Sequence, residues 1–109
     1  MRIKYYYVYI LRCSDGSYYT GFTNNPDRRL EEHNSGRNPG AYTYRRRPVK
    51  LVYVVAFSDP MEGIAFEKQL KGWSKKKKEA LINGDIELLK ALSISYTTMR
   101  KKYGTAPRP

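Results

Sequence analysis

Four side chains along this sequence have the types and the spacing that phosphodiester chemistry requires. Tyr9 and Tyr19 lie ten residues apart, Arg29 follows after another ten, and Glu67 lies further along the chain. A phenol can activate water, a guanidinium can neutralise phosphoryl oxygens, and a carboxylate can hold a divalent cation. These residues form a site only if the secondary structure elements that carry them bring them together.

The two tyrosines belong to two extended segments joined by a turn. Residues 5–12 and 18–23 are rich in aromatic and β-branched residues, and the turn-forming letters SDGS lie between them, which predicts a hairpin. A two-residue turn would place Tyr9 and Tyr19 on opposite faces, whereas a three-residue loop over residues 15–17, or a bulge, places them on one face. We expect this odd loop, with a left-handed residue at its second or third position.

Arg29 lies on a predicted helix that has a clear start and a clear end. Asn25 is a suitable cap, a proline follows it at the first helical position, and Gly36 ends the helix. Leu30 is the only large aliphatic residue of this segment, and Arg29 shares a face with His33 four residues later. The helix is either a polar surface helix anchored by Leu30 or one that directs Arg29 and His33 into a polar pocket.

Glu67 has an unusual place on the next predicted helix, which begins at Asp59 and runs to about Gly72. At about 100° per residue, Glu67 falls on the same arc as Ile64 and Leu70. A carboxylate on a core-facing arc needs a cation, a metal or several donors, because an unpaired buried charge is very costly. Glu67 is either paired with an arginine at the edge of the core or holds a metal ion, and in both cases it must have a partner.

The remaining pattern completes an α+β domain with a small three-stranded antiparallel sheet flanked by helices. The apolar run at 49–57 is the best candidate for a buried central strand. Two further helices are predicted by their caps, one from Ser74 to near Asn83 and one from Asp85 to about Ser93. We expect residues 1–93 to form one domain and residues 94–109 to form a basic, flexible tail.

Composition restricts the partners and the chemistry. The chain has 109 residues and a formal net charge of +11, only part of which lies in the tail, so a polyanion is the expected partner. Cys13 is the only cysteine, which excludes an internal disulfide and a thiolate-rich zinc site. The chain lacks an apolar run of about 18 residues and a signal-peptide pattern, so we expect a cytoplasmic protein without a membrane partner.

Two basic clusters are candidate nucleic-acid contacts of lower specificity. The first combines Tyr44 with Arg45, Arg46 and Arg47, a mixture that can follow a phosphate backbone and stack on exposed bases, although a solvated loop has the same composition. The second is KKKK at 75–78, at a helix start where the dipole disfavours cations. Lys75 and Lys76 there indicate a nearby anion or, alternatively, a solvated basic face.

These motifs also resemble a known family. Tyr7-Val8-Tyr9, Tyr19-Thr20-Gly21, the letters RRL at Arg29 and the glutamate of FEKQL are similar to the GIY-YIG nuclease domain. The resemblance is greatest to small stand-alone bacterial members, sometimes called the YhbQ-like or UPF0213 group, and covers residues 5 to about 83. It extends more distantly to the N-terminal domain of the excision-repair nuclease and to the catalytic subunit of a Holliday-junction resolving nuclease.

The resemblance implies a role for each matching position. Tyr9 and Tyr19 would line the active site, with one of them helping to activate the attacking water. Gly21 would let the backbone pass close to the site and to the nucleic acid. Arg29 would contact the scissile phosphate and Glu67 would coordinate one Mg²⁺ or Mn²⁺. His33 lies where some members have a tyrosine or histidine near the same pocket.

Three features depart from the family pattern: two positions, and the C-terminal asparagine of the repair nucleases, which has no clear match in this sequence. The first tripeptide begins with Tyr7 instead of glycine, and Phe22 stands directly after the second tripeptide, where some nucleases have a lysine. A single metal ligand binds weakly, so water and phosphate oxygens must complete the shell of a cation at Glu67.

The sequence therefore predicts a metal-dependent endonuclease that hydrolyses DNA phosphodiester bonds in repair or recombination, on branched or single-stranded DNA. The alternative is a catalytically weak or inactive nucleic-acid-binding module with the same fold, and a third reading is a basic protein that docks on an acidic partner. Because a phenol has a pKa of about 10, we expect faster cleavage at alkaline pH. The sequence leaves open which tyrosine is the general base and whether DNA or RNA is preferred.

Overall fold

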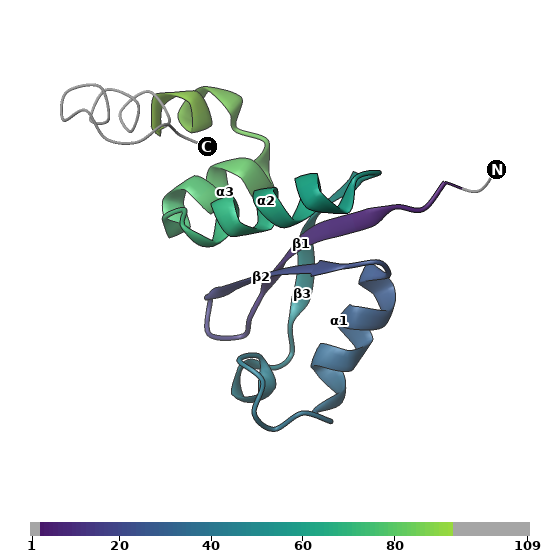
Figure 1. Ribbon diagram of the computed structural model, residues 1–109. Coiled ribbons are helices and arrows are strands. Elements are labelled where there is room, and N and C mark those ends of the chain that lie inside the picture. Colours follow the sequence, from purple (N-terminus) through teal and green to yellow (C-terminus); the bar gives the residue numbers. More distant parts are fainter. Residues whose placement is uncertain (1–2, 93–109) are drawn as a thin grey trace. The chain divides into compact units, whose positions relative to one another are not determined.

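A three-stranded antiparallel sheet with a helix on each side carries the candidate residues (Figure 1). The computed structural model describes residues 3–92. The strands are β1 (Tyr6–Arg12), β2 (Tyr18–Thr23) and β3 (Lys50–Phe57); the helices are α1 (Pro26–Ser35), the 3-10 helix η1 (Tyr44–Arg46), α2 (Pro60–Lys71) and α3 (Lys75–Asn83), and residues 86–92 are also helical. The predicted α+β class and three-stranded sheet are confirmed.

The contacts divide the chain into two units after Gly72. The first contains the sheet, α1 and α2, and the second contains α3 and the helical residues 86–92. The predicted tail, 94–109, and the predicted end of the last helix at Ser93 lie outside the described residues. None of the helices within residues 3–92 combines the length and the apolar character needed to span a membrane.

The prediction that residues 49–57 form the central strand is wrong, because β1 occupies that place. The strand order is β2-β1-β3, and Val8, Ile10 and Leu11 of β1 are fully buried. β3 is an edge strand in which Val54 is 44% exposed. Both α1 and α2 contact β3, so this edge strand carries apolar residues on both faces and has the sequence pattern of a central one.

The loop between β1 and β2 has three residues, as expected, but begins one residue earlier than predicted. Ser14, Asp15 and Gly16 form it, with the Cys13 N–H donating to the Ser17 carbonyl at 2.9 Å. Gly16 has a φ of 84°, the left-handed conformation that glycine adopts without strain. This loop sets the strand register that positions the tyrosines.

The register pairs Tyr9 with Gly21 and Leu11 with Tyr19. Directly paired residues of an antiparallel sheet lie on the same face, and alternate residues of one strand share that face. Tyr9 and Tyr19 therefore lie on one face of the sheet, which confirms the arrangement predicted for a loop with an odd number of residues.

The ends of α1 follow the predicted signals. The Asn25 side chain accepts a hydrogen bond from the Arg28 N–H, and Gly36 at the other end has a φ of 74°. Leu30 packs against the buried cluster that contains Tyr9, Leu11, Cys13 and Val49. A single leucine thus anchors the middle of α1 to the sheet.

The C-terminal half of α1 is tied to β3 by one side-chain amide. Asn34 Nδ2 donates to the Val49 carbonyl at 3.0 Å, and the Val49 N–H donates to Asn34 Oδ1 at 2.8 Å. Asn34 therefore satisfies both backbone groups of a buried residue just before β3, as a neighbouring strand would.

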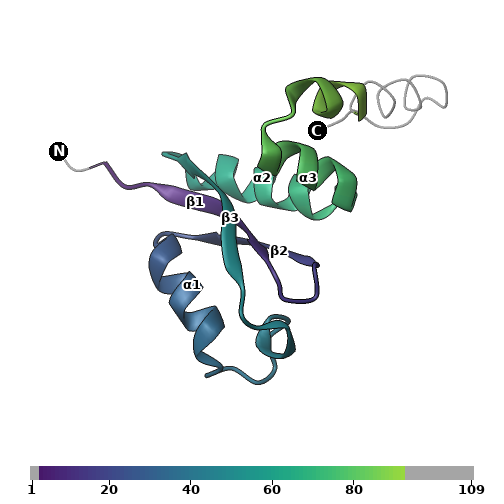
Figure 2. The same ribbon diagram turned by 180° about the vertical axis from the view of Figure 1, so that it is seen from behind.

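α2 lies on the opposite side of the sheet from α1 (Figures 1 and 2). Asp59 caps it, and Gly72 follows its last residue. Gly63 allows the close approach, because a Cβ added there would lie 2.7 Å from the ring of Phe22. Phe22, which replaces the lysine of some nucleases, thus packs between the sheet and α2 and also stacks on Tyr6.

The caps predicted in the second unit are also present. The Ser74 side chain accepts from the Lys77 N–H, and Gly84 ends α3 with a φ of 69°. Asp85 Oδ1 accepts from the Leu88 N–H at 3.1 Å, at the start of the helical residues 86–92.

Candidate active site

Tyr9 and Tyr19 meet on the face of the sheet that α1 covers. Tyr9 is 2% exposed, and the two ring centroids are 6.4 Å apart. A Cβ at Gly21 would overlap the Cζ and hydroxyl oxygen of Tyr9. Glycine is therefore needed opposite Tyr9, because it alone leaves room for the ring across the backbone of β2.

α1 brings Arg29 and His33 to the same place. His33 is 8% exposed, and its Nε2 lies 3.1 Å from the Tyr9 hydroxyl and 3.5 Å from Arg29 Nη2. The Tyr19 ring packs against the imidazole in an edge-to-face arrangement, with the two ring centroids 4.9 Å apart. Of the two interpretations of this helix, the structure agrees with the one in which Arg29 and His33 point into a polar pocket. Leu30 anchors the helix to the sheet.

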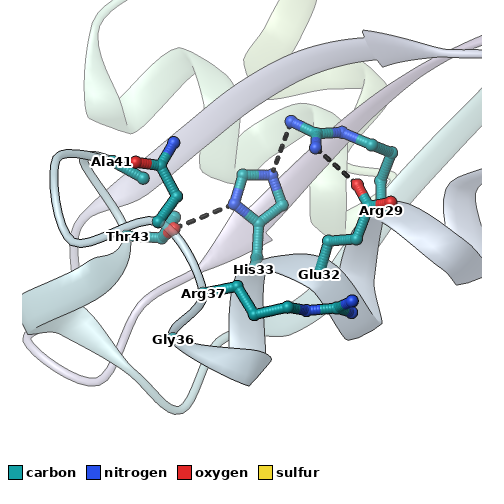
Figure 3. Close-up of a pocket in the computed structure, with 8 residues that line it drawn as sticks. Arg29, Glu32, His33, Gly36, Arg37, Ala41 and Thr43 are labelled. Carbon is teal, nitrogen blue, oxygen red and sulfur yellow. Dashed lines mark hydrogen bonds and ion pairs between the residues drawn. The ribbon is translucent and has the colours of Figure 1, made fainter.

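The partners of His33 define its tautomer. The Thr43 hydroxyl lies 2.8 Å from Nδ1, and the Arg29 guanidinium near Nε2 can only donate. Nε2 is therefore the acceptor, and the Tyr9 hydroxyl donates to it. Nδ1–H donates to the Thr43 hydroxyl (Figure 3). Burial and the charge of Arg29 lower the pKa of His33, which keeps the ring neutral at pH 7.

The phenol of Tyr9 is held in its protonated form. Burial, followed by the nearby Tyr19, raises the pKa of Tyr9, while Arg29 acts in the opposite direction and Glu67 adds a small further increase. Tyr9 therefore serves as a hydrogen-bond donor at neutral pH.

A pocket of about 270 Å³ opens beside Arg29 and His33 (Figure 3). It is lined by Arg29, Glu32, His33, Gly36, Arg37, Asn38, Ala41 and Thr43. Glu32 Oε1 lies 2.7 Å from Arg29 Nη1, and the Arg29 side chain is 36% exposed. The guanidinium has five N–H donors, so donors remain for an oxyanion entering the pocket.

Several residues of the site were not predicted from the sequence. Glu32 pairs with Arg29, Thr43 orients His33, and Arg37 lines the pocket. The ring of Tyr42 stacks on Tyr19 at 5.9 Å. Only the spacing of Glu32 from Arg29 on one helix could have indicated its role, because the segment that holds the other three has no periodicity.

Glu67 has a lysine, not an arginine, as its partner. Its side chain is 17% exposed, and Lys71 Nζ lies 3.1 Å from its Oε2. Glu67 is not among the residues that line the pocket, and residues 3–92 contain no group of three or more His, Cys, Asp or Glu that could hold a metal ion. One carboxylate fits a hydrated Mg²⁺ or Mn²⁺ that shares its shell with substrate oxygens, provided that Lys71 moves aside.

The predicted basic loop does not line the pocket. Arg46 Nε pairs with Asp15 at 3.1 Å, and the Arg47 guanidinium lies 4.7 Å from the Tyr44 ring centroid. Arg45 is exposed. Arg46, Arg47 and Tyr44 thus bind groups of this chain, and the contact of the loop with nucleic acid stays a prediction.

The predicted lysine cluster belongs to the second unit. Lys75 and Lys76 are exposed residues of the first turn of α3. Their proposed contact with nucleic acid stays a prediction.

Comparison with known proteins gives consistent matches. Residues 5–80 match the model of the GIY-YIG catalytic domain. The UPF0213 protein of Bacillus pumilus strain SAFR-032 is 44% identical over 77 residues, 71% of this chain and 78% of the relative, and that of Syntrophus aciditrophicus strain SB is 48% identical over 82 residues, 74% and 93% of the two chains. The solution structure of the protein EF2693 from E. faecalis superposes with a TM-score of 0.54 at 40% identity, over 74% of this chain and 85% of that chain.

Proposed function

The chain belongs to the GIY-YIG catalytic domain family, and on that premise we propose that it is an endonuclease that hydrolyses DNA phosphodiester bonds. The observation that carries the proposal is the convergence of Tyr9 and Tyr19 on His33 and Arg29, the two of these four residues that line the open pocket. We further propose that it acts in the cytoplasm, in repair or recombination.

Arg29 is the proposed phosphate ligand. Its side chain lines the pocket, is partly exposed, and is held by Glu32 and His33. A guanidinium matches the geometry of phosphate oxygens and stabilises the charge that develops on them during displacement. Glu32 supports this role because it holds the Arg29 guanidinium in place while the other N–H groups of the guanidinium stay available.

Tyr19 is the proposed residue that positions or deprotonates the attacking water. The Tyr9 hydroxyl already donates to His33 and its pKa is raised by burial, so Tyr9 is a poor proton acceptor. No hydrogen bond to the Tyr19 hydroxyl occurs within residues 3–92, and its ring lies against both Tyr9 and His33. We propose that Tyr9 instead orients the His33 imidazole and helps to keep it neutral through this hydrogen bond.

Glu67 is the proposed ligand of Mg²⁺ or Mn²⁺. A divalent cation would supply charge neutralisation for the phosphate. Glu67 would contribute one oxygen, while water and the substrate provide the others. We therefore expect the cation to bind weakly in the absence of nucleic acid.

Cleavage of defined substrates tests this proposal. Wild type, Arg29→Ala and Glu67→Gln are incubated with branched, nicked, single-stranded and duplex DNA, and with matched RNA, in Mg²⁺, Mn²⁺ or EDTA. We expect cleavage by wild type only with the cation, and its loss in both variants while fluorescence anisotropy shows retained binding. Equal trace cleavage by all three proteins would indicate contamination and contradict the proposal.

One observation favours the second candidate, a nucleic-acid-binding module with little or no catalysis. Arg29 is paired with Glu32, and Glu67 is paired with Lys71, so both charged groups needed for catalysis are engaged within the chain. If these pairs persist in the complex, the protein binds without cutting. The same experiment separates the two, because a binder gives full anisotropy signals and no cation-dependent product.

A further inference from the structure

The ring of Tyr42 connects the candidate site to the basic loop. It stacks on Tyr19 with a centroid distance of 5.9 Å and an interplanar angle of 28°. The Arg46 guanidinium lies over the same Tyr42 ring, with Cζ 3.9 Å from its centroid. A cation this close to a phenol ring is attracted by the electrons of its face, so Arg46 holds the ring that rests on Tyr19.

Arg46 is itself fixed by four polar contacts, one of which is the hydrogen bond that its backbone N–H donates to the Thr43 carbonyl at 2.9 Å. Its Nη1 donates to the Tyr42 carbonyl at 2.7 Å, and its Nε donates to Asp15 Oδ2 at 3.1 Å. Its own carbonyl accepts from the Ser14 N–H at 2.9 Å. The turn between β1 and β2 lies beside η1 in both views (Figures 1 and 2), so the turn and the loop hold Arg46 between them.

The carboxylate of Asp15 is held in position for its ion pair with Arg46. Its Oδ1 accepts from the backbone N–H and the hydroxyl of Ser17, and these bonds, then Arg46, lower the pKa of Asp15. The carboxylate therefore stays charged at neutral pH. An exposed ion pair alone contributes little, but here the same guanidinium also binds a carbonyl and a ring.

Tyr19 depends on ring contacts for its orientation. Its hydroxyl makes no hydrogen bond with residues 3–92, whereas its ring contacts His33 at 4.9 Å and Tyr42 at 5.9 Å. Packing against both His33 and Tyr42 keeps the Tyr19 hydroxyl in one orientation. This orientation is important because a displacement of about 1 Å in a catalytic group can greatly reduce the rate. Removing Tyr42 would free the ring to rotate.

We propose that Tyr42 and Arg46 are positioning residues that hold Tyr19 in the orientation needed for cleavage, with Asp15 fixing Arg46. This inference rests on the proposed function of Tyr19. It gives Arg46 a role inside the protein in place of the phosphate contact predicted from the sequence.

Steady-state kinetics on the cleaved substrate test the positioning role. Tyr42→Leu is expected to lower kcat about tenfold to a hundredfold with KM nearly unchanged, and Tyr42→Phe, which keeps the ring, is expected to retain activity. Tyr5→Leu is the control, because Tyr5 is a similarly exposed tyrosine just before β1. Unchanged kcat in Tyr42→Leu would overturn the inference.

Two further variants separate positioning from phosphate binding. Arg46→Lys keeps the charge but loses the planar stack, so we expect it to lower kcat as Tyr42→Leu does; a rise in KM alone would instead show a phosphate contact. In a Tyr19→Phe background, Tyr42→Leu should cause no further loss, because both changes act through one hydroxyl. An additive loss would contradict the assignment.

An NMR measurement keeps this test independent of nuclease activity. The ring signals of Tyr19, assigned by their loss in Tyr19→Phe, are compared between wild type and Tyr42→Leu in folded protein. We expect clear shifts and faster ring motion in Tyr42→Leu but not in Tyr42→Phe. Unchanged signals would refute the positioning role, whereas a wild type that cleaves nothing would refute only the proposed endonuclease.

Discussion

His33 is the residue through which most of the site is connected. Its two ring nitrogens contact Tyr9, Arg29 and Thr43. Because the imidazole is buried beside a guanidinium, protonation would place two cations in one poorly hydrated site. The geometry of the pocket therefore depends on a neutral ring.

Low pH should reduce the free energy of unfolding, because His33 is harder to protonate in the folded protein than in the unfolded chain. The pKa of His33 is lowered from its ordinary value of 6.5 in the folded protein, so the unfolded chain binds more protons below that pH. We expect the free energy of unfolding to be level above about pH 6.5 and to fall as the pH decreases below it. Urea denaturation of wild type and His33→Gln from pH 7.5 to 5.5 measures this effect. His33 is the only histidine, so equal pH dependence in both proteins would contradict it.

Gly21 should tolerate no side chain. Gly21→Ala pushes the Tyr9 ring away from β2 and breaks its hydrogen bond to His33. We expect a loss of about 1–3 kcal/mol in the free energy of unfolding and a loss of activity. Gly40→Ala is the matched control, because a Cβ there meets its nearest atom at 3.6 Å. Equal stability of the two variants by thermal melting would show that the ring moves freely.

Lys71 should compete with a divalent cation for Glu67. Lys71→Met removes the ammonium 3.1 Å from Glu67 Oε2, and we expect Mn²⁺ to bind about 1.4- to fivefold more tightly, since a partly exposed pair contributes about 0.2–1 kcal/mol. Electron paramagnetic resonance of free Mn²⁺ measures the affinity directly. Glu67→Gln is the control that should lose binding. An unchanged affinity in Lys71→Met would place the cation elsewhere.

At the scale of the elements, the site is built where α1 meets the sheet. α1 supplies Arg29 and His33, and the β1–β2 register supplies Tyr9 and Tyr19. Leu30 and the Asn34 amide hold the helix against this face. The site therefore depends on two contacts that lie outside the pocket.

Asn34→Ala tests this dependence. It leaves the backbone N–H and carbonyl of Val49, which is 5% exposed, without their partners. An unsatisfied buried group costs about 1–3 kcal/mol, so we expect a destabilisation of that order together with a lower cleavage rate. Glu31→Ala, an exposed change on the same helix, should have neither effect. Chemical denaturation compares them, and equal values would show that α1 does not need the amide.

Element boundaries were predictable where a local signal fixed them. Asn25, Asp59 and Ser74 cap their helices as expected, because the cap bonds are formed within one turn. The central strand was not predictable from apolar content, because β3 is apolar to meet helices on both faces. The turn was displaced by one residue, because Gly16 takes the left-handed position at the loop's third residue.

At the scale of the whole molecule, the net charge of +11 should dominate binding to nucleic acid. We expect affinity to fall steeply with salt and to depend little on base sequence, because neutralised phosphates release counterions. Arg45→Ala should reduce the magnitude of the slope of log affinity against log salt by about one. Arg46→Ala should change this slope much less, since Arg46 is paired with Asp15. Fluorescence anisotropy gives the slopes, and equal effects of the two changes would contradict this assignment.

The main residues of the site were predictable from spacing and motif, but their surroundings were not. The spacing places Tyr9 and Tyr19 on one face of the sheet and Arg29 and His33 on one face of α1, and the family motif predicts that these two faces meet. Thr43, Tyr42 and Arg46 come from a segment between α1 and β3 whose path depends on tertiary contacts. Such contacts leave no periodic signal in the sequence.

The single-turnover cleavage rate of Tyr19→Phe measures whether the Tyr19 hydroxyl takes part in phosphodiester hydrolysis. Tyr18→Phe is the matched control, because it removes the hydroxyl of the neighbouring tyrosine, which points to the other face of β2. We expect Tyr19→Phe to lower the rate about a hundredfold or more and Tyr18→Phe to keep it near that of wild type. Equal rates for wild type and Tyr19→Phe, or no cleavage by wild type, would contradict this role of the hydroxyl.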